Sequence, residues 1–129
     1  MVTGKRKDKL GAEVIAGPNR LTSNVSIEQG GNGSGMDPHR LLEASLTSCT
    51  IITLQMYANL KKLDLVDTEV MVRIDSEGPE THMTREIKLI GNLTPEQRKR
   101  LIEIADKCPI HRLLSSHMTI ETSSIESAG

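Results

Sequence analysis

The feature that most constrains the fold is a long segment, from residue 38 to about residue 62, that is typical of a single helix. Asp37 and Pro38 form a strong helix start, because the aspartate can cap free N–H groups and proline is tolerated at the first helical position. After Glu43 polar groups become fewer, and no charged residue follows until Lys61. Apolar side chains then occupy nearly every angular position, namely Leu46, Cys49, Ile51, Ile52, Leu54, Met56, Tyr57 and Ala58. A helix that is apolar all round is expected to be buried on all sides.

A chain of 129 residues has difficulty surrounding such a helix alone. The length fits one domain, so we expect a single domain over residues 1–129, with residues 1–10 as a polar N-terminal segment. Only one other convincing helix is present, beginning at the capping box Thr94-Pro95-Glu96-Gln97. We therefore predict that a second subunit covers the central helix and that the protein is a homodimer.

The other segments alternate in polarity and predict strands. Residues 12–16 and 20–27 predict a hairpin, and residues 65–75 and 82–91 predict two antiparallel strands, the second with Ile87 and Leu89 on one face. The helix from residue 95 ends near residue 107, a short helix follows to residue 114, and residues 117–123 predict a closing strand. This order predicts an α+β fold with a mostly antiparallel sheet wrapped on a long buried central helix.

Composition argues against several partners. Lys and Arg number 16 and Asp and Glu 17, for a net charge of −1, and no long run of one sign offers a surface to nucleic acid or to an anionic membrane. Tyr57 is the only aromatic residue, so exposed bases have nothing to stack on. The polar start is no secretory signal and no segment is apolar enough for a membrane span. We expect a cytoplasmic protein with no nucleic-acid or membrane partner.

Two further motifs are too incomplete to predict a cofactor or a metal. The glycine-rich sequence EQGGNGSGM lacks the lysine and hydroxyl residue that end a phosphate-binding loop. Cys108 and His111 have a spacing found in zinc sites, to which His39, His82 or His117 could be added. A strong zinc signature contains two such close pairs, and this chain contains one.

Cys49 and Cys108 are the only cysteines, and a static structural disulfide is unusual in a chain without an export signal. Cys49 lies within the most apolar helix, so it is either a small buried hydrophobe or a thiol activated by a cation from elsewhere. Cys108 precedes Pro109, where a helix dipole would favour a thiolate, but a packed junction residue fits equally well. Arg40 and Glu43 lie on other faces of the helix than Cys49, at about 100° per residue.

The sequence GGNGSGMDPHRLLEASLTSCTIITLQMYA, followed far downstream by KCPIHRLL, resembles the OsmC/Ohr family of osmotically inducible and organic hydroperoxide resistance proteins. The resemblance spans roughly residues 21–121. It implies an intertwined homodimer in which sheets wrap two long central helices, with thiol chemistry at the subunit interface. It also implies that Cys49 attacks a peroxide, that Cys108 resolves the sulfenic acid as a disulfide, and that an external dithiol reopens this disulfide.

The resemblance also suggests where an activating pair would lie. The family's glutamate has His39 in its place here, and its arginine comes from the first strand region, where this chain offers Lys9 or Arg20. A histidine cannot anchor an arginine as a carboxylate does. The candidate cations are Arg20, Arg40 and Arg112, of which Arg20 is assigned to the site.

Two functions follow from these observations. The first is an OsmC-like, thiol-dependent peroxidase that reduces organic hydroperoxides in oxidative stress defence, with no bound cofactor. The second is a non-enzymatic dimer whose apolar cleft binds a small hydrophobic ligand, with the cysteines as packing residues. The position of the two sulfur atoms relative to each other separates these hypotheses.

Overall fold

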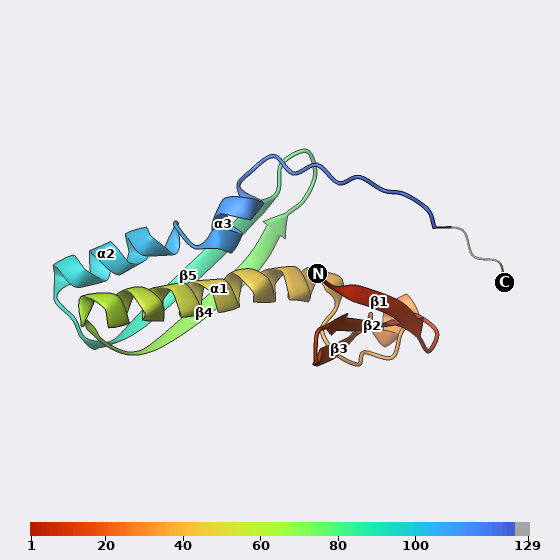
Figure 1. The fold of residues 1–129 in the computed structure, drawn as a ribbon, viewed down its shortest axis with the longest axis horizontal. Helices are drawn as coiled ribbons and strands as arrows, with labels where there is room; N and C mark the ends of the chain where they lie inside the picture. The colour runs from red at the N-terminus through yellow and green to blue at the C-terminus, as the bar shows by residue number, and fades with distance from the viewer. Residues whose placement is uncertain (126–129) are drawn as a thin grey trace.

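The computed structural model describes residues 1–125, which fold into two sheets and a set of helices (Figure 1). In chain order the elements are β1 (Thr3–Lys7), β2 (Gly11–Ala16), β3 (Asn19–Ser23), the short 3-10 helix η1 (Ile27–Gln29), α1 (Pro38–Lys61), β4 (Asp64–Ser76), β5 (His82–Asn92), α2 (Pro95–Ala105) and α3 (Pro109–Leu114). The prediction of an α+β fold with antiparallel sheets is confirmed.

The central helix α1 begins and ends as its sequence predicts. The Asp37 side chain accepts a hydrogen bond from the Arg40 backbone N–H at 2.8 Å, and Pro38 takes the first helical position. At the other end Lys62 adopts the left-handed conformation with φ of 56°, which stops the helix. The helix is thereby fixed in register, with Cys49 near its middle.

A body of five elements surrounds the core. β4 and β5 form an antiparallel hairpin, and α1, α2 and α3 lie on one face of it (Figure 1). The core joins the C-terminal half of α1 to α2 and the hairpin, through Leu54, Ala58, Leu65, Leu101, Ile104 and Ala105. The Thr94 capping box is present, and it fixes the start of α2. This packing sets where the segment after α2 meets α1.

The three N-terminal strands form a separate antiparallel sheet beside the start of α1 (Figure 1). The predicted hairpin is confirmed as β2 and β3, while the segment expected only as a polar N-terminus also contributes strand β1. β1 turns into β2 through Asp8 and Lys9, whose φ values are 52° and 48°. The glycine-rich loop returns to β3 at Gly35, where a Cβ atom would lie 1.9 Å from the Thr22 carbonyl oxygen.

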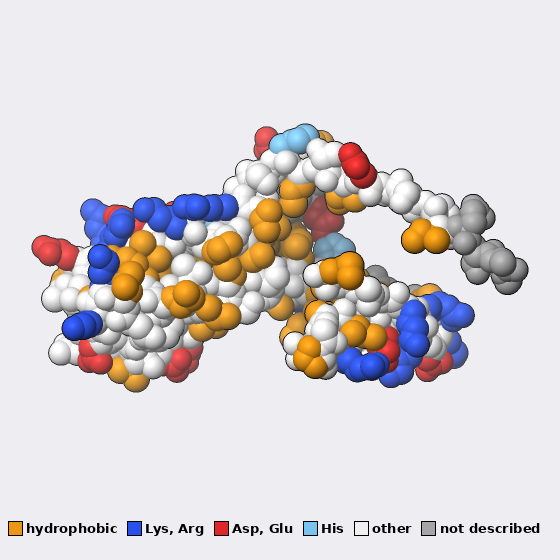
Figure 2. Space-filling model, viewed as in Figure 1, with side chains coloured by type: hydrophobic (Ala, Val, Ile, Leu, Met, Phe, Trp, Pro, Cys, Tyr) orange, Lys and Arg blue, Asp and Glu red, His pale blue; other side chains and the backbone are white. Residues whose placement is uncertain are grey.

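The single chain leaves part of the apolar surface of α1 uncovered. Ile52, Met56 and Leu60 are 58%, 67% and 76% exposed. Figure 2 shows hydrophobic side chains gathered along this side of the body. One chain by itself therefore leaves this side of α1 uncovered, as expected for a helix that the sequence predicts to be covered by a second subunit.

The predicted closing strand is also absent. The chain from residue 117 to residue 125 has no regular secondary structure and extends away from the body (Figure 1). Met118 and Ile120 supply the alternation that suggested a strand, but they are 55% and 87% exposed. A strand needs a neighbouring strand to accept its hydrogen bonds, and this segment has none in the described chain. No helix within residues 1–125 has the length and hydropathy required to cross a bilayer.

Candidate active site

The fold brings the two cysteines together. Cys49 is partly buried on α1, where the Cys108 thiol and the Ile110 backbone N–H lie close enough to its sulfur to lower its pKa. It also lies 3.9 Å from the Thr53 hydroxyl oxygen, one helical turn away. Two thiols that are distant in the sequence therefore share one site.

Cys108 owes its position to the turn between α2 and α3. It is fully buried and is the N-cap of α3, where its sulfur accepts a hydrogen bond from the His111 backbone N–H at 3.3 Å. Its own N–H donates to the Ala105 carbonyl at the end of α2. Pro109 occupies the first position of the short helix. The expected location of Cys108 at a helix start is confirmed.

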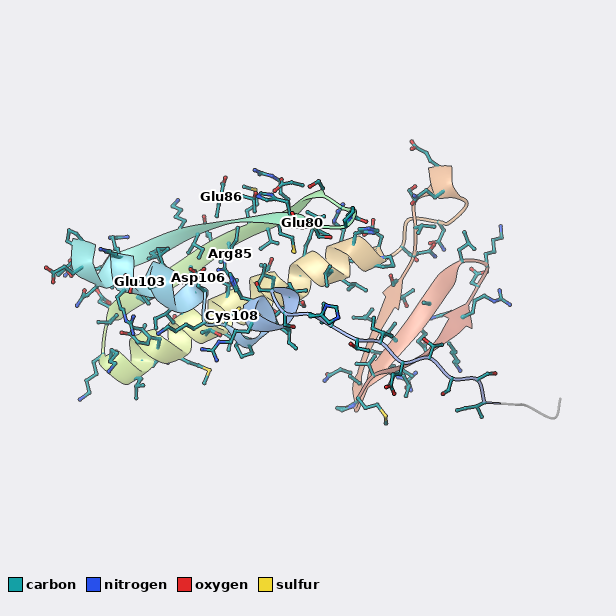
Figure 3. The ribbon with its side chains drawn as sticks, turned by 90° about the horizontal axis from the view of Figure 1, so that it is seen from above. Glu80, Arg85, Glu86, Glu103, Asp106 and Cys108 are labelled. Carbon is teal, nitrogen blue, oxygen red and sulfur yellow. The ribbon has the colours of Figure 1, made fainter. Side chains whose placement is uncertain are left out.

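Arg85 is the main member of this site that the sequence analysis did not single out. Its side chain is 10% exposed. Nη1 donates to Thr50 Oγ1 at 3.2 Å, and Nη2 lies 3.0 Å from Asp106 Oδ1 and 3.1 Å from His111 Nδ1. Figure 3 shows Arg85, Asp106 and Cys108 gathered where the helices meet β5. Arg85 thus contacts α1, the turn before Cys108 and α3.

The contact with Arg85 also sets the hydrogen-bonding role of the His111 ring. A guanidinium group has only donors, so the Nδ1 atom of His111 must accept the hydrogen bond. His111 is thus a hydrogen-bond acceptor for the arginine.

The groups around Cys49 lower the pKa of its thiol below that of an ordinary cysteine. Burial raises the pKa, because a thiolate is less well solvated inside a protein. Hydrogen bonds from the Ile110 N–H, the Cys108 thiol and the Thr53 hydroxyl stabilise the thiolate, and the positive charge of Arg85 adds to them. The stabilising contacts together outweigh burial, so the pKa of Cys49 is lowered. A lower pKa increases the fraction of the nucleophilic thiolate near neutral pH.

The cations proposed from the sequence lie elsewhere in the chain. Arg20 is on β3, where its side chain is 67% exposed and pairs with Glu13 at 3.1 Å. Arg40 pairs with Glu43, whose other carboxylate oxygen accepts from the Ile74 backbone N–H at 2.8 Å. Within one chain neither arginine contacts Cys49.

The remaining candidates lie on exposed segments. His39, in the place of the family's glutamate, pairs with Glu77 at 2.7 Å across the end of the β4–β5 hairpin. Lys9 is in the exposed turn between β1 and β2, and Arg112 is an exposed residue of α3. The single chain therefore brings together Cys49 and Cys108 from the predicted set.

The sequence did contain a signal for Arg85. In the segment that forms β5, residue 85 has the same parity as Ile87 and Leu89, the apolar residues that define its inward face. A strand side chain at that position points toward the helices, so an arginine there is a buried cation. The alternation of the strand is therefore enough to predict that Arg85 lies on the face of β5 that the helices cover.

Two of the hollows that border α1 differ in the chemistry of their lining. One, of about 420 Å³, is lined by polar groups that include Arg85, Asp106 and His111 and by the apolar Leu46, Met83 and Leu114. The other, of about 550 Å³, is an open and largely apolar groove between α1 and β4. In residues 1–125 no group of three or more His, Cys, Asp or Glu side chains is placed to hold one metal ion.

A long helix on an antiparallel hairpin, with one cysteine in that helix and a second at the start of a short C-terminal helix, defines an OsmC-type architecture. Residues 31–123 match the family of OsmC-like proteins. The chain belongs to this family. Among proteins with curated descriptions, none matches the sequence.

Solved structures share the fold at low sequence identity. An OsmC-like protein from Mycoplasma pneumoniae is 16% identical with a TM-score of 0.77, covering 88% of this chain and 85% of that protein. An organic hydroperoxide resistance protein from Legionella pneumophila is 21% identical with a TM-score of 0.64, covering 89% and 88%. Another organic hydroperoxide resistance protein, from Elizabethkingia anophelis, is 19% identical with a TM-score of 0.64, covering 88% and 86%.

Proposed function

We propose that the protein is a thiol-dependent peroxidase that reduces organic hydroperoxides and serves in oxidative stress defence. The observation that carries the proposal is the contact between Cys49 and Cys108 at a site where the pKa of Cys49 is lowered. The likeness of the fold to organic hydroperoxide resistance proteins supports it. The proposal places the protein in the cytoplasm, where thiol reductants keep free cysteines reduced.

The chemistry needs each cysteine in a distinct role. The Cys49 thiolate attacks the terminal oxygen of the hydroperoxide, the O–O bond breaks, and the departing alkoxide takes a proton to become an alcohol. Cys49 is left as a sulfenic acid. The Cys108 sulfur then attacks the Cys49 sulfur, a disulfide forms, and the hydroxyl group leaves with a proton as water. An external dithiol supplies two electrons and two protons to restore both thiols, so no bound cofactor is required.

A peroxide titration tests this function directly. We expect one equivalent of cumene hydroperoxide, added to the reduced protein without reductant, to consume both thiols of a chain and to release cumyl alcohol. Free thiols are counted with a colorimetric reagent, and the mass of the intact chain reports the loss of two hydrogen atoms. A subsequent dithiol should restore both thiols. Thiols that stay free after an excess of hydroperoxide would contradict the proposal.

In this proposal a second copy of the chain completes the site around Cys49. Apolar residues of α1 stay exposed in one chain, and the sheet that carries Arg20 stands beside the body rather than on it. Arg20 reaches Cys49 only if the sheet of one chain packs against the α1 helix of its partner. The peroxidase is therefore proposed to act as a homodimer.

The homodimer has its own test. We expect light scattering to give twice the chain mass of 14.2 kDa. Met56→Asp should shift the mass toward one chain, since a charge would then lie on the apolar side of α1. The exposed Lys61→Asp on the same helix is the control and should leave the mass unchanged. A wild-type protein of single-chain mass at all concentrations would contradict the dimer.

The largely apolar groove between α1 and β4 favours one alternative function, the binding of a small hydrophobic ligand without catalysis. The peroxide titration separates the two functions. Stable free thiols together with binding of an apolar fluorescent probe would support the binder.

A further inference from the structure

We propose that Arg85 is the positioning residue of the thiol pair, a cation held by Asp106 that aligns Cys108 with Cys49 and supplies positive charge beside them. The catalytic meaning of this assignment rests on the proposed peroxidase function. Its effect on the cysteines themselves does not, because thiol reactivity can be measured without any peroxide.

The contacts of Arg85 reach the surroundings of both cysteines. Thr50, which receives Nη1 at 3.2 Å, is the neighbour of Cys49 on α1. His111, which receives Nη2 at 3.1 Å, donates its backbone N–H to the sulfur of Cys108. One planar group with several donors therefore links the helix that carries Cys49 to the helix that begins at Cys108.

Asp106 is suited to hold this arginine in place. Its Oδ1 atom lies 3.0 Å from Nη2 of Arg85, and it lies two residues before Cys108 in the turn that joins α2 to α3. A carboxylate is the natural partner of a guanidinium group. The ion pair thus ties the strand β5 to the segment that positions the second thiol.

The fold alone does not call for a cation at this position. Residue 85 continues the inward face of β5 formed by Ile87 and Leu89, where an apolar side chain would pack. Removing an arginine from water costs free energy unless its donors are paired. With only 10% of its side chain exposed, the charge of Arg85 is weakly screened by solvent. Because this burial is unfavourable for the fold, we attribute it to the role of Arg85 beside the two thiols.

Arg85 and Asp106 also supply a type of pair that the helix start lacks. The place of the family's glutamate holds His39, which is engaged with the exposed Glu77. Within one chain, an arginine–carboxylate pair beside the cysteines comes from β5 and the α2–α3 turn. The charged or titratable groups that the contacts place around Cys49 are Arg85, Asp106, Cys108 and His111.

The first measurement isolates the effect on Cys49. In a Cys108→Ser background only Cys49 can react, and its alkylation by iodoacetamide is followed across the pH range. Arg85→Met should raise the midpoint, because the positive charge of Arg85 is one of the influences that lower the pKa of the Cys49 thiol. Lys88→Met removes the same charge from the outward face of the same strand, and it should leave the midpoint unchanged.

The second measurement isolates the positioning of Cys108. In the protein with both cysteines, a diamide-type reagent oxidises the two thiols to the disulfide. Arg85→Lys should leave the pH midpoint of Cys49 alkylation close to that of the wild type, but it should form the disulfide several-fold more slowly. Lysine retains the charge but cannot contact Thr50, Asp106 and His111 together. A purely structural arginine would instead lower the melting temperature and leave the rates of the folded protein unchanged.

The outcomes decide the proposal even if one variant is unstable. Should Arg85→Met fail to fold, as judged by circular dichroism, Arg85→Gln keeps amide donors without the charge and is measured in its place. A midpoint and a rate of disulfide formation equal to those of Lys88→Met would overturn the role of Arg85. If wild-type protein does not react with cumene hydroperoxide, the peroxidase function fails, while the alkylation and disulfide measurements still test Arg85.

Discussion

Cys49→Ser is expected to abolish reduction of cumene hydroperoxide, with a loss of turnover on the order of a thousandfold or more, because the attacking atom is removed. The assay follows peroxide consumption with a dithiol as reductant. The remaining rate should match that of free Cys108, which is fully buried behind α3 and poorly placed to meet peroxide. A serine hydroxyl cannot replace the thiolate, since it stays protonated at neutral pH.

Cys108→Ser is the matched variant, and its expected result is different. Cys49 should still react once with each molecule of peroxide and then stop as a sulfenic acid, which a dimedone-type reagent captures. With a dithiol present, Cys108→Ser turns over more slowly than the wild type if the dithiol reduces the sulfenic acid of Cys49 more slowly than Cys108 does.

The outcome that would reject Cys49 as the nucleophile is an equal rate of peroxide turnover in the wild type and in Cys49→Ser.

Leu54→Ala is expected to cost about 2–5 kcal/mol of unfolding free energy, the range for a buried leucine whose removal leaves a cavity. Leu54 is 0% exposed and packs with Ala58, Leu65 and Leu101 where α1 meets α2 and the hairpin. Urea unfolding followed by circular dichroism gives the change in free energy.

Leu60→Ala provides the comparison on the same helix. In one chain Leu60 is 76% exposed, so the truncation should cost less than about 0.5 kcal/mol when the protein is a monomer. A larger cost that grows with protein concentration would indicate that a second copy covers Leu60. A cost below about 1 kcal/mol for Leu54→Ala would mean that the core is packed differently from the one described here.

Local sequence signals were sufficient for most of the body. Asp37 and Pro38 fixed the start of α1, the Thr94 capping box fixed that of α2, and Cys108 caps α3 as its place before Pro109 suggested. Each of these signals acts within one helical turn, so no knowledge of the rest of the chain is needed.

The errors arose where structure depends on distant partners. β1 carries a run of basic residues with no apolar alternation, and it becomes a strand by pairing with β2. The segment after residue 117 has the alternation but no neighbouring strand in the described chain. Alternation describes which face of a strand is buried, but hydrogen-bonding neighbours decide whether the strand forms.

The candidate site shows the same division. Geometry along one helix correctly excluded Arg40 and Glu43 as direct partners of Cys49, since they pair with each other instead. The approach of Cys108 to Cys49 was expected only from resemblance to a family, because it depends on how α2 returns along α1. The alternation of β5 places Arg85 on the inward face, but its partners lie on α1, in the α2–α3 turn and on α3, and only the folded chain brings these together.

The N-terminal sheet has a consequence for synthesis on the ribosome. In the described chain, buried aliphatic side chains begin at Leu46, so the three strands emerge before any of the apolar sequence that forms the core. During that interval β1 is an exposed edge strand of a sheet that has no hydrophobic core to pack against. Lys5, Arg6 and Lys7 place positive charges along it. Such charges discourage the edges of nascent chains on neighbouring ribosomes from joining into aggregates before the correct packing surface exists.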